Sequence, residues 1–325
     1  MKKYFIRTSA GDKLGWGNLH RMLILYRILK QKTKYVYFYV KGNKSVFNYL
    51  DKEKISFIKI TDKNLKKENE ILKKNGRADI SFIEVLNSSL RLQKIYKYNS
   101  KKLVVFDDLL NNKYICDILF CCQTKKNLKI KNIKKIYNSY KYFPVKKNFN
   151  YYIKKKKIIK KKIKKITVFL GGGDYAKENL KIAKILDKID LDITFLIGYE
   201  NSKYIKKKIK RINKNFKIHI NHKEIPKILF NSDFVICGGG YSKIEVSYLK
   251  TPLVSICVQN HQNIIAKNFR SNFGIDIIEY NKINFSNLTK SIFKMNYVKR
   301  KRMANKFSRY FSLNGINRII NIVKI

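Results

Sequence analysis

Three short polar stretches in the second half of the chain follow apolar runs that are typical of buried strands. They read GGGD (171–174), GGGYS (238–242) and NHQN (260–263). Glycines lack a Cβ atom, so a ligand can approach the main chain there, and main-chain N–H groups at such turns bind anions. Because ligands of open α/β sheets bind at the carboxyl ends of the strands, we expect the three stretches to converge on one ligand.

The GGGYS stretch is the most specific of the three. Ser242 is placed to cap the helix that follows, and Glu245 lies in the first turn of that helix. A carboxylate in this position can accept hydrogen bonds from a ribose diol, as acids in nucleotide sites do. The alternative is an ordinary glycine-rich turn with a favourably placed acid at a helix N-terminus.

The N-terminal stretch KYFIRTSAGDKLGWGNLHRMLILYRIL (3–29) has the same strand, glycine loop and helix order. Gly15 and Gly17 lie in the loop, and a helical pattern opens at Asn18. Asn18 suits an N-cap, but its amide cannot accept a proton from water. His20 can act as a base, although it lies about 200° around the helix from Asn18. A partly packed surface histidine is the alternative interpretation of His20.

Strand and helix patterns alternate on both sides of a lysine-rich stretch. That stretch, YYIKKKKIIKKKIKKI (151–166), is interpreted as a solvated linker, and a patch that meets phosphates or lipid headgroups is the alternative. Before it, strands are predicted at 4–7, 35–40, 55–60, 80–83, 103–106 and 116–122, and helices at 18–30, 44–50 and 63–75. After it, strands are predicted at 166–170, 193–197, 217–220, 234–237 and 253–257, and helices at 176–188, 202–213, 224–231, 243–249 and from near Asn263. The pattern predicts an α/β protein of two Rossmann-like lobes, 1–150 and 151–325, with parallel sheets facing a central cleft.

The net charge of +51 is an ambiguous signal. The chain has 62 lysines and 11 arginines, and Asn, Ile, Tyr and Phe are also abundant. All five abundant types have codons made of A and T, so an AT-rich genome explains the bias. A specific nucleic-acid reader would be expected to use more arginine. We therefore predict no specific nucleic-acid partner, and weak peripheral contact with an anionic membrane is the remaining use of the charge.

Five cysteines, without CxxC spacing, lie in apolar strand-like contexts. They are predicted to be buried free thiols in a reducing, cytoplasmic compartment. No run of 18 apolar residues predicts a membrane span, and the apolar run after the first lysines is too short for a signal peptide.

The order of these motifs resembles the two-lobed GT-B sugar-nucleotide enzymes. ITVFLGGGD (166–174) and NSDFVICGGGYSKIEVSYLKTPLVSICVQNHQN (231–263) are similar to their C-terminal half, of glycosyltransferase family 28 type. IRTSAGDKLGWGNLHR (6–21), LVVFDDLLNNKYICDILF (103–120) and NGINR (314–318) resemble further elements. The closest likeness is to the UDP-sugar hydrolase of pseudaminic acid synthesis and related spore-coat polysaccharide proteins, and it covers most of the chain.

The resemblance implies that the second lobe binds UDP and the first lobe binds the sugar, with the last helix packing back on the first lobe. Gly172, Gly173 and Asp174 would lie near phosphate, Gly239, Gly240 and Ser242 at the diphosphate, Glu245 on the ribose, and His261 and Gln262 toward the sugar. In the first lobe it assigns substrate binding to Arg7, Gly15, Gly17 and Arg21. Glycine N–H groups would stabilise the leaving diphosphate, so neither a metal nor a cofactor is expected.

One substitution separates the chain from the family pattern. Where the hydrolase has a histidine thought to act as the base, this sequence has Asn18, so the catalytic candidates are Asn18 and His20. Three functions stay open: a UDP-sugar hydrolase of surface-glycan synthesis, a glycosyltransferase that uses a UDP-sugar, and a sugar-nucleotide binder without catalysis. A basic nucleic-acid-binding protein is a remote fourth, supported by charge alone.

Overall fold

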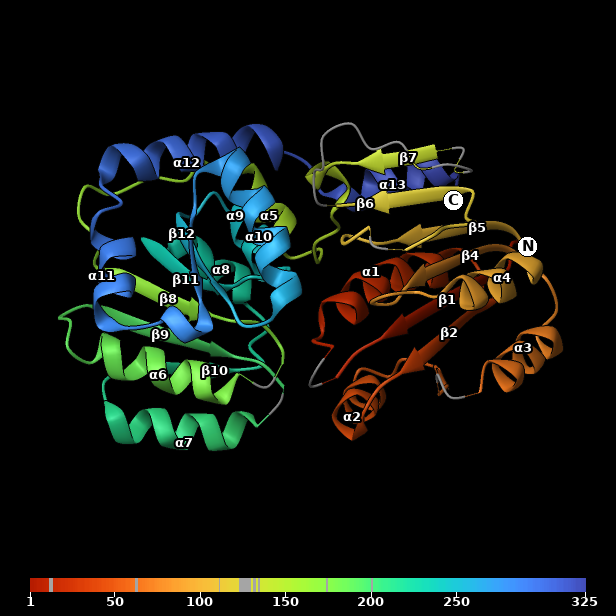
Figure 1. Cartoon of the computed structure of the whole chain (residues 1–325), viewed down its shortest axis with the longest axis horizontal. Helices are drawn as coiled ribbons and strands as arrows, with labels where there is room; N and C mark the ends of the chain where they lie inside the picture. Colours follow the sequence, from red (N-terminus) through yellow and green to blue (C-terminus); the bar gives the residue numbers. More distant parts are fainter. Residues whose placement is uncertain are drawn as a thin grey trace. The chain divides into compact units, whose positions relative to one another are not determined.

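A computed structural model of the chain describes residues 1–11, 14–61, 64–110, 112–122, 130, 133, 135–173, 175–199 and 201–325. The chain divides into two compact units, each with its own sheet (Figure 1). The first unit comprises 1–144 together with 315–325, and the second comprises 145–314. The C-terminal helix α13 (Gly315–Val323) thus belongs to the first unit, where it contacts the 3₁₀ turn Tyr140–Tyr142.

The first unit has a parallel sheet in the order β3-β2-β1-β4-β5-β6-β7. Its strands are β1 (Tyr4–Ser9), β2 (Val36–Lys41), β3 (Ile58–Lys59), β4 (Ala78–Glu84), β5 (Ser100–Phe106), β6 (Ile118–Cys121) and β7 (Lys135–Asn138). The helices are α1 (Gly17–Lys32), α2 (Lys44–Lys52), α3 (Leu65–Lys74) and α4 (Leu90–Tyr98). Side-chain caps from Asn43, Asn64 and Ser89 begin α2, α3 and α4, as expected for these residue types.

The second unit repeats this plan with the strand order β10-β9-β8-β11-β12-β13. Its strands are β8 (Lys165–Phe169), β9 (Asp192–Ile197), β10 (Lys217–Ile220), β11 (Phe234–Gly238), β12 (Leu253–Cys257) and β13 (Asp276–Glu279). Its helices are α5 (Phe149–Lys154), α6 (Ala176–Leu186), α7 (Ser202–Ile212), α8 (Ile225–Asn231), α9 (Ser242–Tyr248), α10 (Asn260–Phe273), α11 (Phe285–Phe293) and α12 (Tyr297–Tyr310).

Both sheets have a point where the strand order reverses. In the first unit it lies between β1 and β4, and in the second between β8 and β11. Loops that leave neighbouring strands in opposite directions open a space at the carboxyl edge, which is where open α/β sheets bind ligands. The GGGD and GGGYS stretches follow β8 and β11, so the strongest sequence motifs of the chain flank the reversal point of the second sheet.

The lysine-rich stretch 151–166 differs from a solvated linker at two places. Its start lies in α5, and Lys157 is half-buried. The Lys157 ammonium donates to the carbonyls of Phe230 and Ser232 at the end of α8, and burial lowers the pKa of this lysine to about 8. A lysine at a helix C-terminus satisfies carbonyls that have no partner within the helix, so this residue fastens the connecting stretch to the second unit.

The five cysteines are buried free thiols, as predicted. In the described part of the chain, no helix has the length and apolarity needed to cross a bilayer.

Candidate functional site

Three loops converge at the carboxyl edge of the second sheet. Gly238, the last residue of β11, lies so close to Leu170 that a Cβ would overlap the Leu170 carbonyl oxygen. A Cβ on Gly239 would come within 2.6 Å of the Cys257 sulfur and 3.0 Å of the Gln262 Cβ. The glycines are therefore required for the packing of the loops after β8, β11 and β12.

Gln262 ties two of these loops together. Its side chain is buried, its Oε1 accepts a hydrogen bond from the Val258 N–H at 3.0 Å, and its side chain also hydrogen-bonds the Tyr175 hydroxyl. An amide held on both sides keeps one orientation. Gln262 thus has a structural role in addition to the sugar contact predicted for it.

The loop after β8 has a main-chain conformation that favours glycine. Gly171 has a φ of +114°, and Gly172 packs so closely against Gly198 that a Cβ on Gly198 would overlap its Cα. A Cβ on Gly173 would meet the Tyr175 ring at 3.1 Å. Asp174, predicted near phosphate, lies outside the described residues.

The GGGYS loop differs in detail from the predicted cap. Helix α9 begins at Ser242, and the Ser242 hydroxyl donates back to the Gly238 carbonyl at 3.2 Å instead of capping the helix. The Gly239 N–H is also engaged, because it donates to the Ile256 carbonyl at 2.7 Å. Within the described part of the chain, the N–H groups of Gly240 and Ser242 donate to no protein acceptor, so these two can serve an incoming anion.

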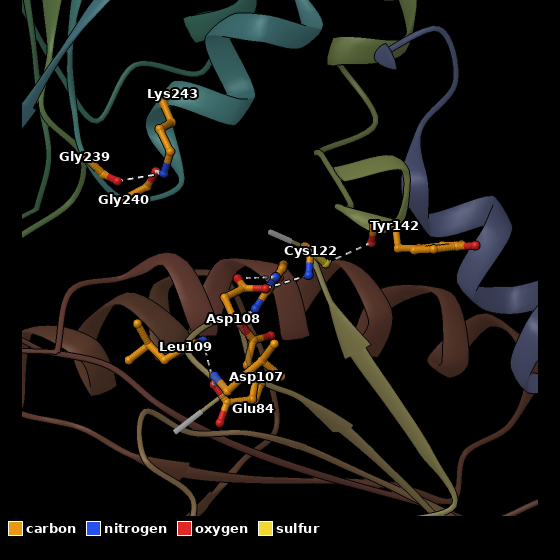
Figure 2. Close-up of polar contacts among 11 residues, drawn as sticks. Glu84, Asp107, Asp108, Leu109, Cys122, Tyr142, Gly239, Gly240 and Lys243 are labelled. Carbon is orange, nitrogen blue, oxygen red and sulfur yellow. Dashed lines mark hydrogen bonds and ion pairs between the residues drawn. The ribbon is translucent and has the colours of Figure 1, made fainter. Parts of the chain in front are cut away.

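Lys243 is a residue of this loop that the sequence analysis missed. Its side chain is fully buried, and its ammonium donates to the carbonyls of Gly239 at 2.7 Å and Gly240 at 2.8 Å (Figure 2). The ammonium also lies 5.6 Å from the centre of the Phe269 ring. A lysine three and four residues after a glycine pair can reach back over one helical turn, which is the signal that could have identified it.

Glu245 presents a carboxylate without a protein hydrogen bond or ion pair among the described residues. The residue is partly buried, and burial raises the pKa of its carboxyl to about 7, while Lys146 opposes the shift. A desolvated acceptor of this kind is costly in the protein alone. It fits the predicted acceptor for the hydroxyl groups of a ribose.

His261 lies in the first turn of α10, on the third loop. Its imidazole is partly buried, and burial lowers its pKa, with a further contribution from the positive charge of Lys243. Because an unperturbed histidine has a pKa near 6.5, this side chain is mainly neutral at pH 7 and can accept a hydrogen bond or a proton.

In the first unit, the loop before α1 depends on Gly15. Gly15 has a φ of +72° and pairs with Gly11 through two main-chain hydrogen bonds of 2.7 and 3.1 Å. Helix α1 begins at Gly17 with Trp16 as the N-cap, so Asn18 is already a helical residue and not the predicted cap. The apolar face predicted for helix α1, which includes Leu19 and Leu23, is buried.

His20 faces aromatic side chains. Its ring centre lies 6.0 Å from that of Trp16 and 5.8 Å from that of Tyr49, which belongs to α2. This environment agrees with the alternative interpretation of a packed histidine, and the role of His20 as a base stays a prediction.

Arg7 and Arg21 hold the first unit together. The Arg7 guanidinium is fully buried, donates to Glu68 at 2.9 Å and to the Thr8 carbonyl at 2.7 Å, and shares Glu68 with the Tyr96 hydroxyl. A buried arginine paired in this way is a core element. The structure thus places Arg7 in the core of the first unit, and the substrate contact expected for it stays a prediction.

Arg21 connects α1 to the carboxyl ends of two strands. Its guanidinium donates to Glu84 at 2.6 Å and to Asp108 at 3.1 Å, and it packs on the rings of Phe106 and Phe143. Only 2% of the residue is exposed. Arg21 thus positions the first turn of α1, and the substrate contact expected for it stays a prediction.

The paired aspartates after β5 organise the neighbouring loops. Asp107 accepts hydrogen bonds from the Leu109 N–H at 2.8 Å and the Tyr114 hydroxyl at 2.8 Å, and Asp108 accepts from the Cys122 N–H at 2.6 Å (Figure 2). Both residues are buried. Among the described residues, no group of three or more His, Cys, Asp or Glu side chains gathers as metal ligands would.

Comparisons with known proteins agree with this architecture. Residues 166–319 match the glycosyltransferase family 28 C-terminal domain. No curated protein matches the chain. Among solved structures, MurG of Acinetobacter baumannii aligns over 99% of both chains with a TM-score of 0.66 and 12% identity. The UDP-GlcNAc 2-epimerase of Neisseria meningitidis, solved with UDP-GlcNAc, aligns over 99% of this chain and 100% of its own with a TM-score of 0.61 and 11% identity. MnaA of S. aureus, solved with UDP, aligns over 100% of this chain and 96% of its own with a TM-score of 0.63 and 13% identity. The chain therefore has the GT-B fold of two Rossmann-like lobes, and the family match falls mainly on its second unit.

Proposed function

We propose that this protein is an enzyme that binds a UDP-sugar and cleaves the bond between the sugar and the diphosphate. The observation that carries the proposal is Glu245, whose carboxylate is desolvated and has no hydrogen-bond partner among the described residues. It lies beside the loop whose Gly240 and Ser242 N–H groups can meet an anion. A ribose acceptor next to diphosphate donors is the arrangement that a nucleoside diphosphate requires.

The second unit would stabilise the leaving UDP. Charge develops on the diphosphate as the bond to the sugar breaks, and fixed main-chain donors stabilise that charge without reorganising. The loops that hold these donors are locked by the close contacts of Gly238 and Gly239 and by the two-sided hydrogen bonding of Gln262. Rigid donors of this kind support cleavage as well as binding.

Water is the first candidate for the attacking group, because the sequence resembles a hydrolase of nonulosonic acid synthesis over most of its length. A sugar or lipid acceptor is the second candidate, and Asn18 favours it. An amide at this position cannot activate water as a histidine does, whereas an acceptor hydroxyl can be activated by another group. His261, neutral at pH 7, is such a group.

The proposal is tested with a panel of UDP-, GDP- and CMP-sugars, by measuring nucleotide release with and without acceptor sugars. We expect release from UDP-sugars only. Glu245→Gln should weaken UDP binding by about 1–3 kcal/mol, since a neutral amide is a poorer partner for the ribose hydroxyls. Glu70→Gln, an exposed position on α3, is the matched control.

The pH dependence adds a specific signature. The wild-type affinity for UDP should fall as the pH drops from about 8 to about 6, because the Glu245 carboxyl, with its pKa of about 7, becomes protonated. The Glu245→Gln variant should lack this dependence. Equal UDP affinity of wild type and Glu245→Gln across this range in calorimetry would remove Glu245 from the site.

A further inference from the structure

The turn between α11 and α12 exposes two large apolar side chains. Phe293, the last residue of α11, is 51% exposed, and Val298, the second residue of α12, is 63% exposed. Figure 1 shows the two helices meeting at a corner of the second unit. The Asn296 side chain caps α12 by accepting a hydrogen bond from the Lys299 N–H at 3.0 Å. A short, hydrogen-bonded turn thus presents both apolar side chains.

Basic side chains share the exposed helix faces with these two residues. Lys290 lies three residues before Phe293 on α11, and Lys301 and Arg302 lie three and four residues after Val298 on α12. Residues with this spacing are neighbours on a helix surface. All three basic residues are exposed. Each apolar side chain therefore has a positive charge beside it.

No acidic residue balances these charges along the segment. The sequence 281–325 contains neither Asp nor Glu, and all 22 acidic residues of the chain precede it. Within the described part of the chain, neither Lys290, Lys301 nor Arg302 forms an ion pair with a carboxylate. The Lys301 ammonium lies 5.8 Å from the centre of the Tyr297 ring, a contact that leaves its charge in place. The turn therefore combines exposed apolar groups with positive charge that other groups can meet.

We propose that the α11–α12 turn is a docking surface for an anionic lipid bilayer: Phe293 and Val298 enter the boundary between headgroups and acyl chains, and Lys290, Lys301 and Arg302 contact lipid phosphates. Apolar insertion and attraction to anionic headgroups are the two contributions that bind peripheral proteins to membranes. Long basic side chains reach the headgroups while their stems cover apolar surface. A nucleic acid matches the charge alone, whereas an anionic bilayer matches both features. Because two side chains bury little area, the contact is reversible and not an anchor.

Two double variants separate the apolar contribution from the charge. Phe293→Ser with Val298→Ser removes the apolar side chains, and Lys301→Gln with Arg302→Gln removes two of the charges. Cosedimentation with vesicles of phosphatidylcholine and phosphatidylglycerol in equal parts measures the affinity, and vesicles of phosphatidylcholine alone are the reference.

Helix α7 provides matched controls, because it is also basic and exposes an aromatic side chain. Tyr204→Ser removes a side chain that is 53% exposed, and Lys206→Gln with Lys207→Gln removes two exposed charges. These controls report how much binding comes from the high net charge of the chain as a whole.

We expect wild type to bind the anionic vesicles about tenfold or more tightly than phosphatidylcholine alone, and both double variants to lose about tenfold or more of that affinity. The α7 controls should stay within about twofold of wild type. Absence of wild-type binding, or equal losses in the α7 controls, would overturn the proposal. Full binding by the apolar variant together with loss in the charge variant would also overturn it, because a general polyanion contact, such as one with nucleic acid, gives that result.

The depth of the contact has its own reporter. Trp16 is the single tryptophan of the chain and is buried, so Phe293→Trp adds an indole at the turn. Lipids brominated on the acyl chain should quench the fluorescence of this variant and leave that of wild type unchanged. Vesicle binding by Phe293→Trp without quenching would contradict insertion at this turn.

Discussion

At the scale of single residues, the candidate site contains a carboxylate, that of Glu245, whose burial costs free energy in the ligand-free protein. Glu245 keeps a partly buried carboxylate whose pKa is raised to about 7. Groups with perturbed ionisation often mark functional sites, because a bound ligand supplies the partner that the protein alone does not provide. The same reasoning predicts a measurable penalty in the ligand-free protein.

Replacing Glu245 by Gln should stabilise the free protein at neutral pH. The folded pKa of about 7 lies above the ordinary glutamate value of 4.5, so folding binds a proton between these pH values, and stability falls as the pH rises through this window. The glutamine side chain of the variant cannot ionise, so the variant does not lose stability in this pH window. Its advantage over wild type should be near zero at about pH 4 and reach about 1–3 kcal/mol at about pH 8.

Urea unfolding at several pH values measures this difference, with Glu70→Gln as the control for removing one exposed acid. A stability gap between Glu245→Gln and wild type that does not change with pH would show that the carboxyl is not strained by burial. Together with the expected weaker UDP binding, the result would identify a residue kept for function at the expense of stability.

Asn18 gives a second prediction at this scale. If water attacks the sugar, the Asn18→His variant should hydrolyse UDP-sugar about 10²–10⁴-fold faster than wild type, because general-base assistance has this magnitude. Its activity should rise with pH through the histidine pKa, near ~6.5 or below it, since the N-terminus of α1 disfavours a positive charge. The measurement is the pH profile of UDP release without an acceptor.

The His20→Ala variant is the control for the neighbouring imidazole. It should behave as wild type, since His20 packs against Trp16 and Tyr49. Strong hydrolysis by wild type that disappears in His20→Ala would show that His20 is the base after all. Efficient wild-type turnover only with an added acceptor would instead support a transferase.

At the scale of elements, the close approach of the ends of β8 and β11 positions the loops that we propose as the ligand site. Gly238 lets the end of β11 pack against the Leu170 carbonyl, whereas among the described residues a Cβ on Gly240 would meet only the Gln262 amide, at 3.9 Å. Neither residue has a positive φ, so alanine can adopt the main-chain conformation of both positions. The two glycines therefore differ in what surrounds them and not in their conformation.

Because of this difference in surroundings, alanine substitutions at Gly238 and Gly240 should affect stability and UDP binding differently. Gly238→Ala should destabilise the protein by about 1–3 kcal/mol through overpacking. Gly240→Ala should leave the free energy of unfolding nearly unchanged and weaken UDP binding by about tenfold or more, the effect of one misplaced methyl group in a binding site. Denaturant unfolding and calorimetry on both variants test this, and tight UDP binding by Gly240→Ala would place the diphosphate elsewhere.

Much of the element order followed from sequence because the strands are short apolar runs that end in glycine or polar loops. Strands β10 and β12 were predicted with their observed bounds, Lys217–Ile220 and Leu253–Cys257. Helix α4 was not predicted, because LRLQKIYKY buries only Leu92, Gln93 and Tyr96. The pairing of Arg7 with Glu68 and the reach of Lys243 to the glycine carbonyls depend on tertiary packing, so residue type and spacing alone could predict neither contact.

At the scale of the whole molecule, the chain passes between its two units at two places, after Pro144 and after Asn314. Asn314 is buried within the second unit and bonds Val145 on both sides: its Oδ1 accepts from the Val145 N–H at 3.1 Å, and its Nδ2 donates to the Val145 carbonyl at 2.8 Å. Gly315, in the first unit, packs so closely on the Phe143 main chain that a Cβ would overlap it. In the Asn-Gly pair of the NGINR motif, Asn314 thus binds the first residue of the second unit, and Gly315 packs against the first unit next to the place where the chain leaves it.

Asn314→Ala should therefore destabilise the protein by about 1–3 kcal/mol. The substitution leaves the main-chain N–H and carbonyl of Val145 without their side-chain partner, and it also removes the hydrogen bond to Asn150. Asn305→Ala, at an exposed position of α12, removes an amide without a comparable loss and should change stability by less than about 0.5 kcal/mol.

Chemical unfolding gives both values, and limited proteolysis of Asn314→Ala should cut near residue 145 before it cuts within either sheet, since opening is expected first where main-chain hydrogen bonds are lost. Wild-type stability and an unchanged cleavage pattern in Asn314→Ala would mean that the Asn314 amide does not hold this crossing.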